Sequence, residues 1–131
     1  MYDKYSYYMS LTGPKADVDK LTERFRNCPD VPEELVPHYF LDDPDYDGPV
    51  TRTFQIDPDV GAIDEWTSST EDVSTLAMTA PDVEIILHTV NLNNALEEYM
   101  EIWQHGKYAC DKVKLAINSE DEMRELLINQ E

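Results

Sequence analysis

The sequence is poor in cysteine, in glycine and in positive charge. Its 131 residues include two cysteines and four glycines, and 28 acidic side chains against 10 basic ones give a formal net charge of −18. Cys28 and Cys110 are too few for a disulfide framework, and neither belongs to a Cys-x-x-Cys pair. The glycines form no GxGxxG or GxxxxGK pattern, which argues against a phosphate-binding loop and a nucleotide-dependent enzyme.

Long hydrophobic runs are also missing. The longest apolar stretch, Val83 to Val90, contains Glu84 and His88, whereas a membrane-spanning helix needs about 20 apolar residues. The first five residues lack the basic region and apolar run of a signal peptide. We therefore expect a cytoplasmic protein that does not bind membranes, in the host cytoplasm if a phage encodes it.

The excess of acidic side chains limits the classes of molecule that the protein can bind. A surface with this charge repels nucleic-acid phosphates and anionic lipid, so direct binding to DNA, RNA or a membrane surface is not expected. The charge favours a basic partner, a cation or simple solubility, and composition does not decide among the three. Hydrophobic residues make up 41% of the chain, which is enough for the core of one domain over residues 1–131.

The first part of the chain has the pattern of a strand followed by a helix. Aromatic and polar residues alternate from Lys4 to Leu11, as in a strand. After Gly13-Pro14, apolar residues recur at helical spacing until prolines stop them near Cys28. The expected buried face of this helix consists of Val18, Leu21 and Phe25.

Residues 29 to 65 form a proline-rich acidic segment, which we interpret as an insertion in the domain. It contains six of the eight prolines. A short helix over Glu33–Leu41, interrupted by Pro37, and a strand over Val50–Ile56 are expected here.

The second half predicts a helix over Thr70–Ala80 and a central strand over Val83–Val90. Residues 92–103 fit either a helix or a strand. We favour a hairpin that turns at His105-Gly106-Lys107 and continues over Tyr108–Ile117, before a terminal helix that opens with the capping-box pattern Ser119-x-x-Glu122. The predicted fold is α+β, a ferredoxin-like antiparallel sheet with two or three helices on one face.

Short stretches resemble a known family. Val31-Pro32-Glu33-Glu34-Leu35, Ala80-Pro81-Asp82-Val83 with the following Glu84-Ile85-Ile86-Leu87, and Gly106-Lys107-Tyr108 are similar to parts of the YubB family. That resemblance implies a ferredoxin-like domain and an origin on a phage or plasmid, with no catalytic residue to carry over. The chain departs from the family in its centre, where only Trp66 remains of a tryptophan-rich motif.

No catalytic pattern emerges. The three histidines, His38, His88 and His105, lie far apart in sequence and form no His-x-His or His-Glu-x-x-His motif. Neither cysteine has a base tied to it by a sequence pattern. We therefore expect a protein that is not an enzyme and uses no cofactor.

One acidic loop resembles half of a calcium site. Asp43-Pro44-Asp45-Tyr46-Asp47-Gly48 matches the first half of an EF-hand loop. The second half does not match, because Pro49 takes the seventh position and Phe54 replaces the closing glutamate at the twelfth. A solvated turn is favoured, and a calcium-binding module remains an alternative.

Acidic residues cluster in a way that predicts a partner-binding surface, with Tyr46, Phe54 and Trp66 interleaved like bases between phosphates. The predicted binding residues are Asp42, Asp43, Asp45, Asp47, Asp57, Asp59, Asp64 and Glu65, followed by Glu97, Glu98 and Glu101. We expect an acidic inhibitor of the anti-CRISPR or anti-restriction type, which blocks the nucleic-acid-binding surface of a defence complex by DNA mimicry. The alternatives are an immunity protein against a basic toxin nuclease and a face that only keeps the protein soluble.

Overall fold

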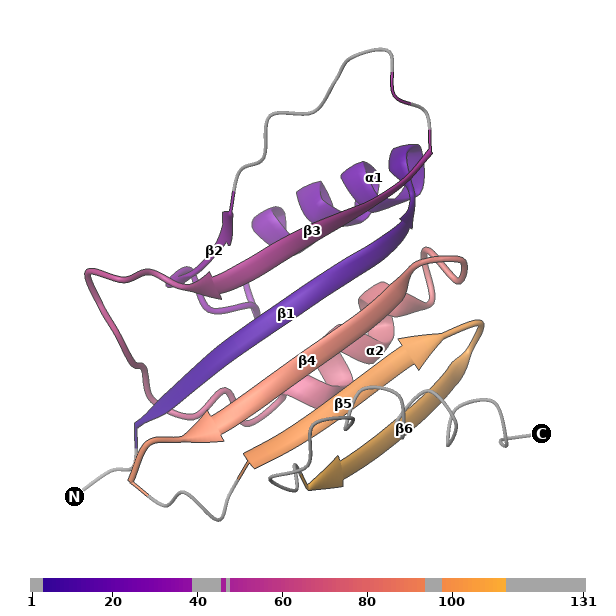
Figure 1. Ribbon diagram of the computed structural model, residues 1–131. Helices are drawn as coiled ribbons and strands as arrows, with labels where there is room; N and C mark the ends of the chain where they lie inside the picture. Colours follow the sequence, from indigo (N-terminus) through magenta and orange to yellow (C-terminus); the bar gives the residue numbers. More distant parts are fainter. Residues whose placement is uncertain (1–3, 39–45, 47, 94–97, 113–131) are drawn as a thin grey trace.

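A computed structural model describes residues 4–38, 46, 48–93 and 98–112. These residues form one antiparallel sheet and two helices, which lie on the same face of the sheet (Figure 1). The elements in chain order are β1 (Tyr5–Pro14), α1 (Lys15–Asn27), β2 (Leu35–His38), β3 (Pro49–Ile56), α2 (Ser69–Ala77), β4 (Glu84–Asn91), β5 (Glu98–Gln104) and β6 (Lys107–Lys112). The strands are ordered β2-β3-β1-β4-β5-β6, so the predicted α+β class and antiparallel sheet are confirmed.

The core lies between the sheet and the helices. On β1, Tyr7, Met9 and Leu11 are buried while Tyr8 between them is exposed, as the alternation predicts. Met9 stands opposite Phe54 on β3 and opposite Leu87 on β4. The predicted α1 face is confirmed, because Val18, Leu21 and Phe25 are all buried in the same cluster.

Two β-α-β units interleave in the sheet. Strand β2 runs parallel to β1 with β3 between them, and β4 runs parallel to β3 with β1 between them. Each helix therefore connects two parallel strands that are not neighbours. As a result, the loop after α1 and the loop before α2 both lie at the end of the sheet where β1 begins.

A second buried cluster lies on the opposite face of the sheet, over β4, β5 and β6. It consists of Ile86, Met100, Ile102 and Ala109. These residues alternate along their strands with core residues of the helix face, so both faces of this half of the sheet are apolar. The central position predicted for the strand over Val83–Val90 is confirmed.

The hairpin predicted after residue 92 is confirmed over β5 and β6. Gln104 pairs with Lys107, and the two turn residues both have positive φ, 55° at His105 and 74° at Gly106. This combination belongs to a tight turn that matches the twist of the strands. The helical alternative is wrong for Glu98–Gln104, and residues 94–97 lie outside the described part.

Other expectations need correction. The helix expected over Glu33–Leu41 is wrong for Leu35–His38, which is an edge strand paired with β3; an edge strand tolerates Pro37, whereas a helix interior does not. Residues 29–65 also supply both β2 and β3, so these stretches belong to the sheet rather than to an insertion.

Helix α2 ends at Ala77 instead of Ala80, and the expected terminal helix lies outside the described residues. In the part described, no helix is long and apolar enough to cross a membrane.

Candidate functional site: an acidic cavity

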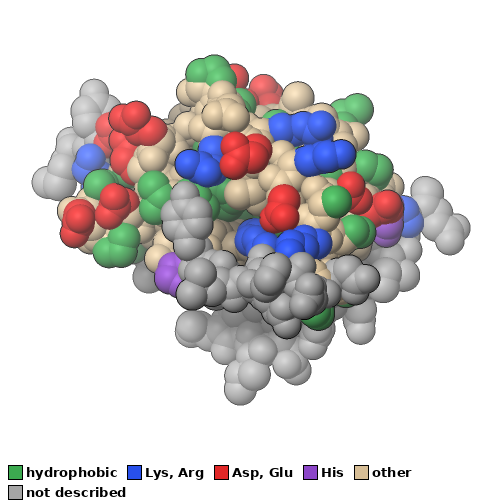
Figure 2. Space-filling view, turned by 90° about the horizontal axis from the view of Figure 1, so that it is seen from above, with side chains coloured by type: hydrophobic (Ala, Val, Ile, Leu, Met, Phe, Trp, Pro, Cys, Tyr) green, Lys and Arg blue, Asp and Glu red, His purple; other side chains and the backbone are tan. Residues whose placement is uncertain are grey.

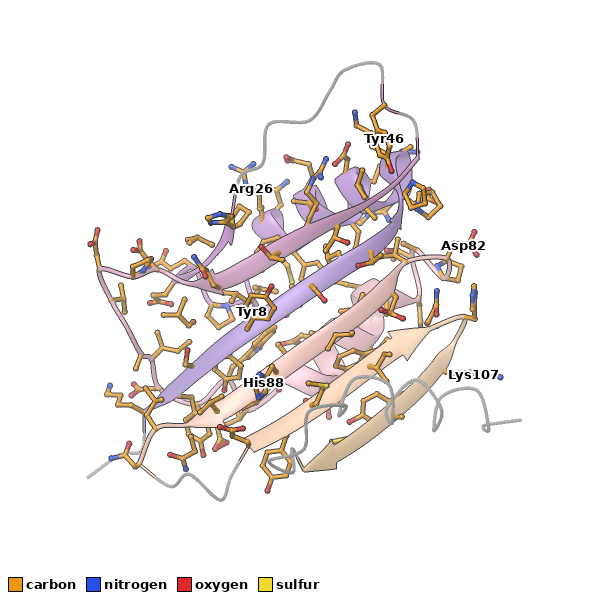
Figure 3. The ribbon with its side chains drawn as sticks, viewed as in Figure 1. Tyr8, Arg26, Tyr46, Asp82, His88 and Lys107 are labelled. Atoms are coloured by element: carbon orange, nitrogen blue, oxygen red, sulfur yellow. The ribbon has the colours of Figure 1, made fainter. Side chains whose placement is uncertain are left out.

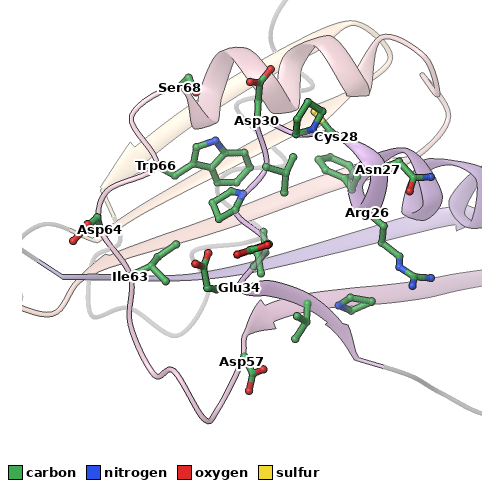
Figure 4. A pocket seen from close by; sticks show the side chains of 18 of the residues that line it. Arg26, Asn27, Cys28, Asp30, Glu34, Asp57, Ile63, Asp64, Trp66 and Ser68 are labelled. Carbon is green, nitrogen blue, oxygen red and sulfur yellow. The ribbon is translucent and has the colours of Figure 1, made fainter.

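A cavity of about 1010 Å³ opens at the end of the sheet where the two loops meet. One loop, residues 28–34, connects α1 to β2, and the other, residues 57–68, connects β3 to α2. Between the loops, Glu34 projects into the space, while Asp57 and Asp64 stand at its edge (Figure 4). We call this site the acidic cavity, because its lining includes the carboxylates of Asp30, Glu33, Glu34, Asp57, Asp64 and Glu65.

Buried apolar side chains form the other part of the lining. Val31, Leu35, Ile63 and Trp66 line the cavity and belong to the main core cluster. The acidic residues are therefore neighbours of tightly packed core residues, which limits how far their backbone can shift. Protein–protein interfaces typically combine an apolar core with a polar rim, and the lining of this cavity supplies side chains of both kinds.

The first loop is held by short-range hydrogen bonds. The Val31 N–H donates to the Cys28 carbonyl at 3.2 Å, and the Leu35 N–H donates to the Pro32 carbonyl at 3.1 Å. Pro29 and Pro32 cannot continue α1, so the helix ends at Asn27 and the chain forms these two turns instead. The loop is also tied to the second one, because the Asp57 N–H donates to the Glu34 carbonyl at 2.8 Å.

The second loop turns around Asp57. Its carbonyl accepts the N–H groups of Val60 and Gly61, both at 2.9 Å, and its Oδ1 accepts the Asp59 N–H at 2.9 Å. Gly61 has a φ of 78°, which a residue without a side chain adopts at little cost. Asp57 is therefore a turn-forming residue as well as part of the cavity lining.

Trp66 fixes the far end of that loop to the sheet. Its backbone N–H donates to the buried Tyr7 hydroxyl at 2.7 Å, and its indole Nε1 donates to Asp72 Oδ2 at 2.8 Å. Burial raises the pKa of Tyr7 to about 12, although the hydrogen bond from Trp66 acts in the opposite direction. Tyr7 therefore stays neutral at physiological pH, with its hydroxyl oxygen available as the acceptor.

The charge around the cavity is almost entirely negative. Arg26 is the one base among the described residues that line it, and Lys4 pairs with Asp64 at 2.8 Å from outside. In Figure 2, several acidic side chains lie toward the left end of the molecule, and most of the visible basic side chains lie over its middle, with further acids between them. The described residues contain no group of three His, Cys, Asp or Glu placed to hold a metal ion.

Several predicted binding residues come together here. Asp57, Asp64 and Glu65 line the acidic cavity, and the exposed Asp59 lies in the same loop. Asp42, Asp43, Asp45, Asp47 and Glu97 lie outside the described residues, as does most of the loop that resembles half of a calcium site.

Glu98 and Glu101 do not form a common surface, because residues three apart on a strand point to opposite faces. Glu98 lies 3.6 Å from His88 on the sheet face away from the helices, where Tyr8 stands opposite His88 (Figure 3). Glu101 is only 5% exposed and accepts hydrogen bonds from Thr70 at 2.6 Å and Tyr108 at 2.8 Å. The expectation that Glu101 belongs to an exposed acidic patch is therefore wrong.

Sequence reasoning missed half of the acidic lining. Asp30 precedes the expected helix over Glu33–Leu41, and Glu33 and Glu34 begin it, whereas the predicted binding residues start only at Asp42. The usable signal was topological, because in interleaved β-α-β units the loop after the first helix and the loop before the second meet at one end of the sheet.

Known proteins offer no guide to this site. Comparisons with family models, with curated proteins and with solved structures found no match to the chain. The resemblance to the YubB family therefore stays a prediction. What the acidic cavity does has to be inferred from its own geometry and charge.

Proposed function

We propose that this protein is a non-enzymatic inhibitor that uses the acidic cavity and its rim to occupy the nucleic-acid-binding surface of a basic partner protein. The observation that carries the proposal is the convergence of six carboxylates from two separate loops around one cavity with a single basic lining residue. Two of the six have roles within the fold, because Asp57 forms the turn of its loop and Asp64 pairs with Lys4. Holding all six together is nevertheless costly, since like charges repel one another.

The rim has the chemistry to compete with a phosphate backbone. Lys and Arg side chains on a nucleic-acid-binding protein bind phosphate oxygens, and carboxylates held at fixed positions offer them the same kind of partner. Asp30, Glu33 and Glu65 are exposed at the cavity. Such rim charges steer encounter and speed association, so binding should weaken as salt rises.

The setting we propose is a phage or other mobile element acting in the host cytoplasm against a CRISPR effector or restriction enzyme. The resemblance to the YubB family supports this setting. We further propose that the fold is ferredoxin-like, with β5 and β6 added at one edge. The two interleaved β-α-β units support that assignment.

A displacement assay tests the function. Labelled DNA is bound to each of a panel of purified restriction enzymes and RNA-guided nucleases, and the protein is added at about 0.15 M salt while anisotropy reports free DNA. We expect stoichiometric displacement from at least one member, weakening as salt rises. No displacement from any member would contradict the proposed targets, and inhibition confined to a basic toxin nuclease would favour an immunity protein.

Matched variants separate the cavity from overall charge. D30N/E33Q removes two charges from the acidic cavity. D17N/D82N removes two from the opposite end of the sheet, where Asp17 lies in the first turn of α1 and Asp82 lies 3.6 Å from His105. We expect the first pair to weaken displacement about 10-fold or more and the second to change it less than about twofold. Equal effects would mean that net charge alone drives binding.

A further inference from the structure

A second, smaller cavity lies beside the acidic one, between the start of α2 and the helix-side face of the sheet. Its volume is about 370 Å³. Five aromatic side chains from β1, β5, β6 and the loop before α2 line it, and we call it the aromatic pocket. These side chains are Tyr5, Tyr7, Trp66, Tyr99 and Tyr108.

The aromatic rings are held in place by one another and by the core. Tyr7 stacks on Tyr5 with ring centroids 6.2 Å apart and meets Trp66 edge-on at 5.8 Å. Tyr108 packs against Trp103 at 5.2 Å. The pocket is therefore a preformed site, and ligand binding would not have to order its walls.

Two carboxylates also line the aromatic pocket. Glu65 is exposed at its mouth, where it also lines the acidic cavity, and Glu101 is buried. Glu101 Oε2 accepts hydrogen bonds from the hydroxyls of Thr70 and Tyr108, which are both lining residues. Among the described residues, no Lys, Arg or His forms an ion pair with Glu101, and none of the lining residues is basic.

A buried carboxylate whose hydrogen-bond donors are neutral hydroxyls is costly to keep charged. The free-energy cost of keeping this carboxylate charged falls when a cation binds beside it, because opposite charges attract. The faces of aromatic rings attract cations as well, by about 0.5–2 kcal/mol for each well-placed ring. Rings and carboxylates thus favour the same ligand, and they disfavour an anion or a neutral polar group.

We infer that the aromatic pocket binds one alkylammonium or guanidinium group. This inference rests on the proposed function for the source of that group, a Lys or Arg side chain of the basic partner, because Glu65 joins the pocket to the acidic cavity. A free amine would offer the same chemistry, and the experiment separates the two sources.

The direct test uses the isolated protein and small probes. Butylammonium, butylguanidinium and the neutral 1-pentanol are titrated at constant ionic strength while NMR follows the two indole N–H signals. These signals are distinct reporters, because Trp66 Nε1 donates to Asp72 and Trp103 Nε1 donates to Ser74. We expect saturable shifts with one or both cations and none with 1-pentanol; shifts that fail to saturate, or equal shifts with 1-pentanol, would overturn the inference.

Neighbouring acids supply the control. Glu65 lines the aromatic pocket and Asp64 does not, although both line the acidic cavity. E65Q should weaken cation binding several-fold and D64N should leave it unchanged. E101Q should abolish binding. If that variant does not fold, Y99L removes a half-buried ring from the wall and should weaken binding several-fold. Equal cation affinity in E65Q, D64N and Y99L would overturn the inference.

The same variants keep this inference separate from the proposed function. D30N/E33Q should displace DNA about 10-fold or more weakly and still bind butylammonium, because neither residue lines the aromatic pocket. If Y99L also loses displacement, the cation comes from the partner protein. If Y99L keeps displacement and loses butylammonium, the pocket serves a free amine.

Discussion

The Tyr7 hydroxyl connects the core of the sheet to the loop that carries half of the acidic lining. It accepts the Trp66 N–H at 2.7 Å from a position that is 2% exposed. In Y7F this buried N–H loses its partner, and an unsatisfied buried donor costs about 1–3 kcal/mol. We expect the free energy of unfolding, measured by urea denaturation, to fall by that amount; an unchanged value would mean that the loop does not depend on this bond.

The same hydroxyl gives a pH signature. The pKa of Tyr7 is raised from 10.0 to about 12, chiefly by burial. Below pH 10 the folded and unfolded states both keep the proton, and between pH 10 and 12 only the folded state keeps it, so the free energy of unfolding falls with rising pH. Wild type should lose more stability than Y7F across this window, and parallel losses in the two proteins would contradict the shift.

Tyr108 reinforces this alkaline sensitivity. Burial raises its pKa far above the usual value, and the hydrogen bond to Glu101 and the charge of Glu101 raise it further. The contribution of Tyr108 to the free energy of unfolding is therefore also lost as pH rises above 10. Y108F should reduce the alkaline loss of stability in the same direction as Y7F, as measured by thermal melting between pH 9 and 12.

At the scale of elements, the β5–β6 hairpin depends on two residues with positive φ. Gly106 adopts 74° freely, whereas His105 at 55° is strained. G106A should lower the free energy of unfolding by about 1 kcal/mol, and H105G should raise it by up to about 1 kcal/mol. Changes of the same sign in the two variants, measured by chemical denaturation, would contradict this description of the turn.

The elements show what sequence patterns can specify. Apolar periodicity predicted β1, the buried face of α1 and the central position of β4, because these segments bury alternate or helically spaced residues. The hairpin followed from the turn residues. Periodicity failed for Leu35–His38, where four residues are too few to show a period and strand pairing with β3 decides the conformation.

The candidate site was less predictable than the elements, because it is made by contacts between distant loops. Clustering in sequence did identify Asp57, Asp59, Asp64 and Glu65, which lie in one loop. It grouped Glu98 with Glu101, although they stand on opposite faces of β5. It also missed Asp30, whose place in the cavity depends on how the two β-α-β units interleave.

At the scale of the whole molecule, the net charge of −18 dominates its interactions. Four bases do gather on α1, namely Lys15, Lys20, Arg24 and Arg26, but the Arg26 side chain pairs with Glu23 at 3.2 Å. We therefore expect no binding of duplex or single-stranded DNA or RNA at physiological salt, because phosphate contacts would have to overcome strong net repulsion. A gel shift with micromolar affinity would contradict this expectation.

The central claim is that the acidic cavity, rather than the charge of the molecule as a whole, contacts the partner. Hydrogen exchange on the complex with a nuclease from which the protein displaces DNA tests it most directly. We predict that amides in residues 28–34 and 57–65 become at least about 10-fold more protected on binding, while the turn at His105 and Gly106, at the opposite end of the sheet, exchanges as in the free protein. Protection confined to that turn or to α1, with both cavity loops exchanging as before, would contradict the claim.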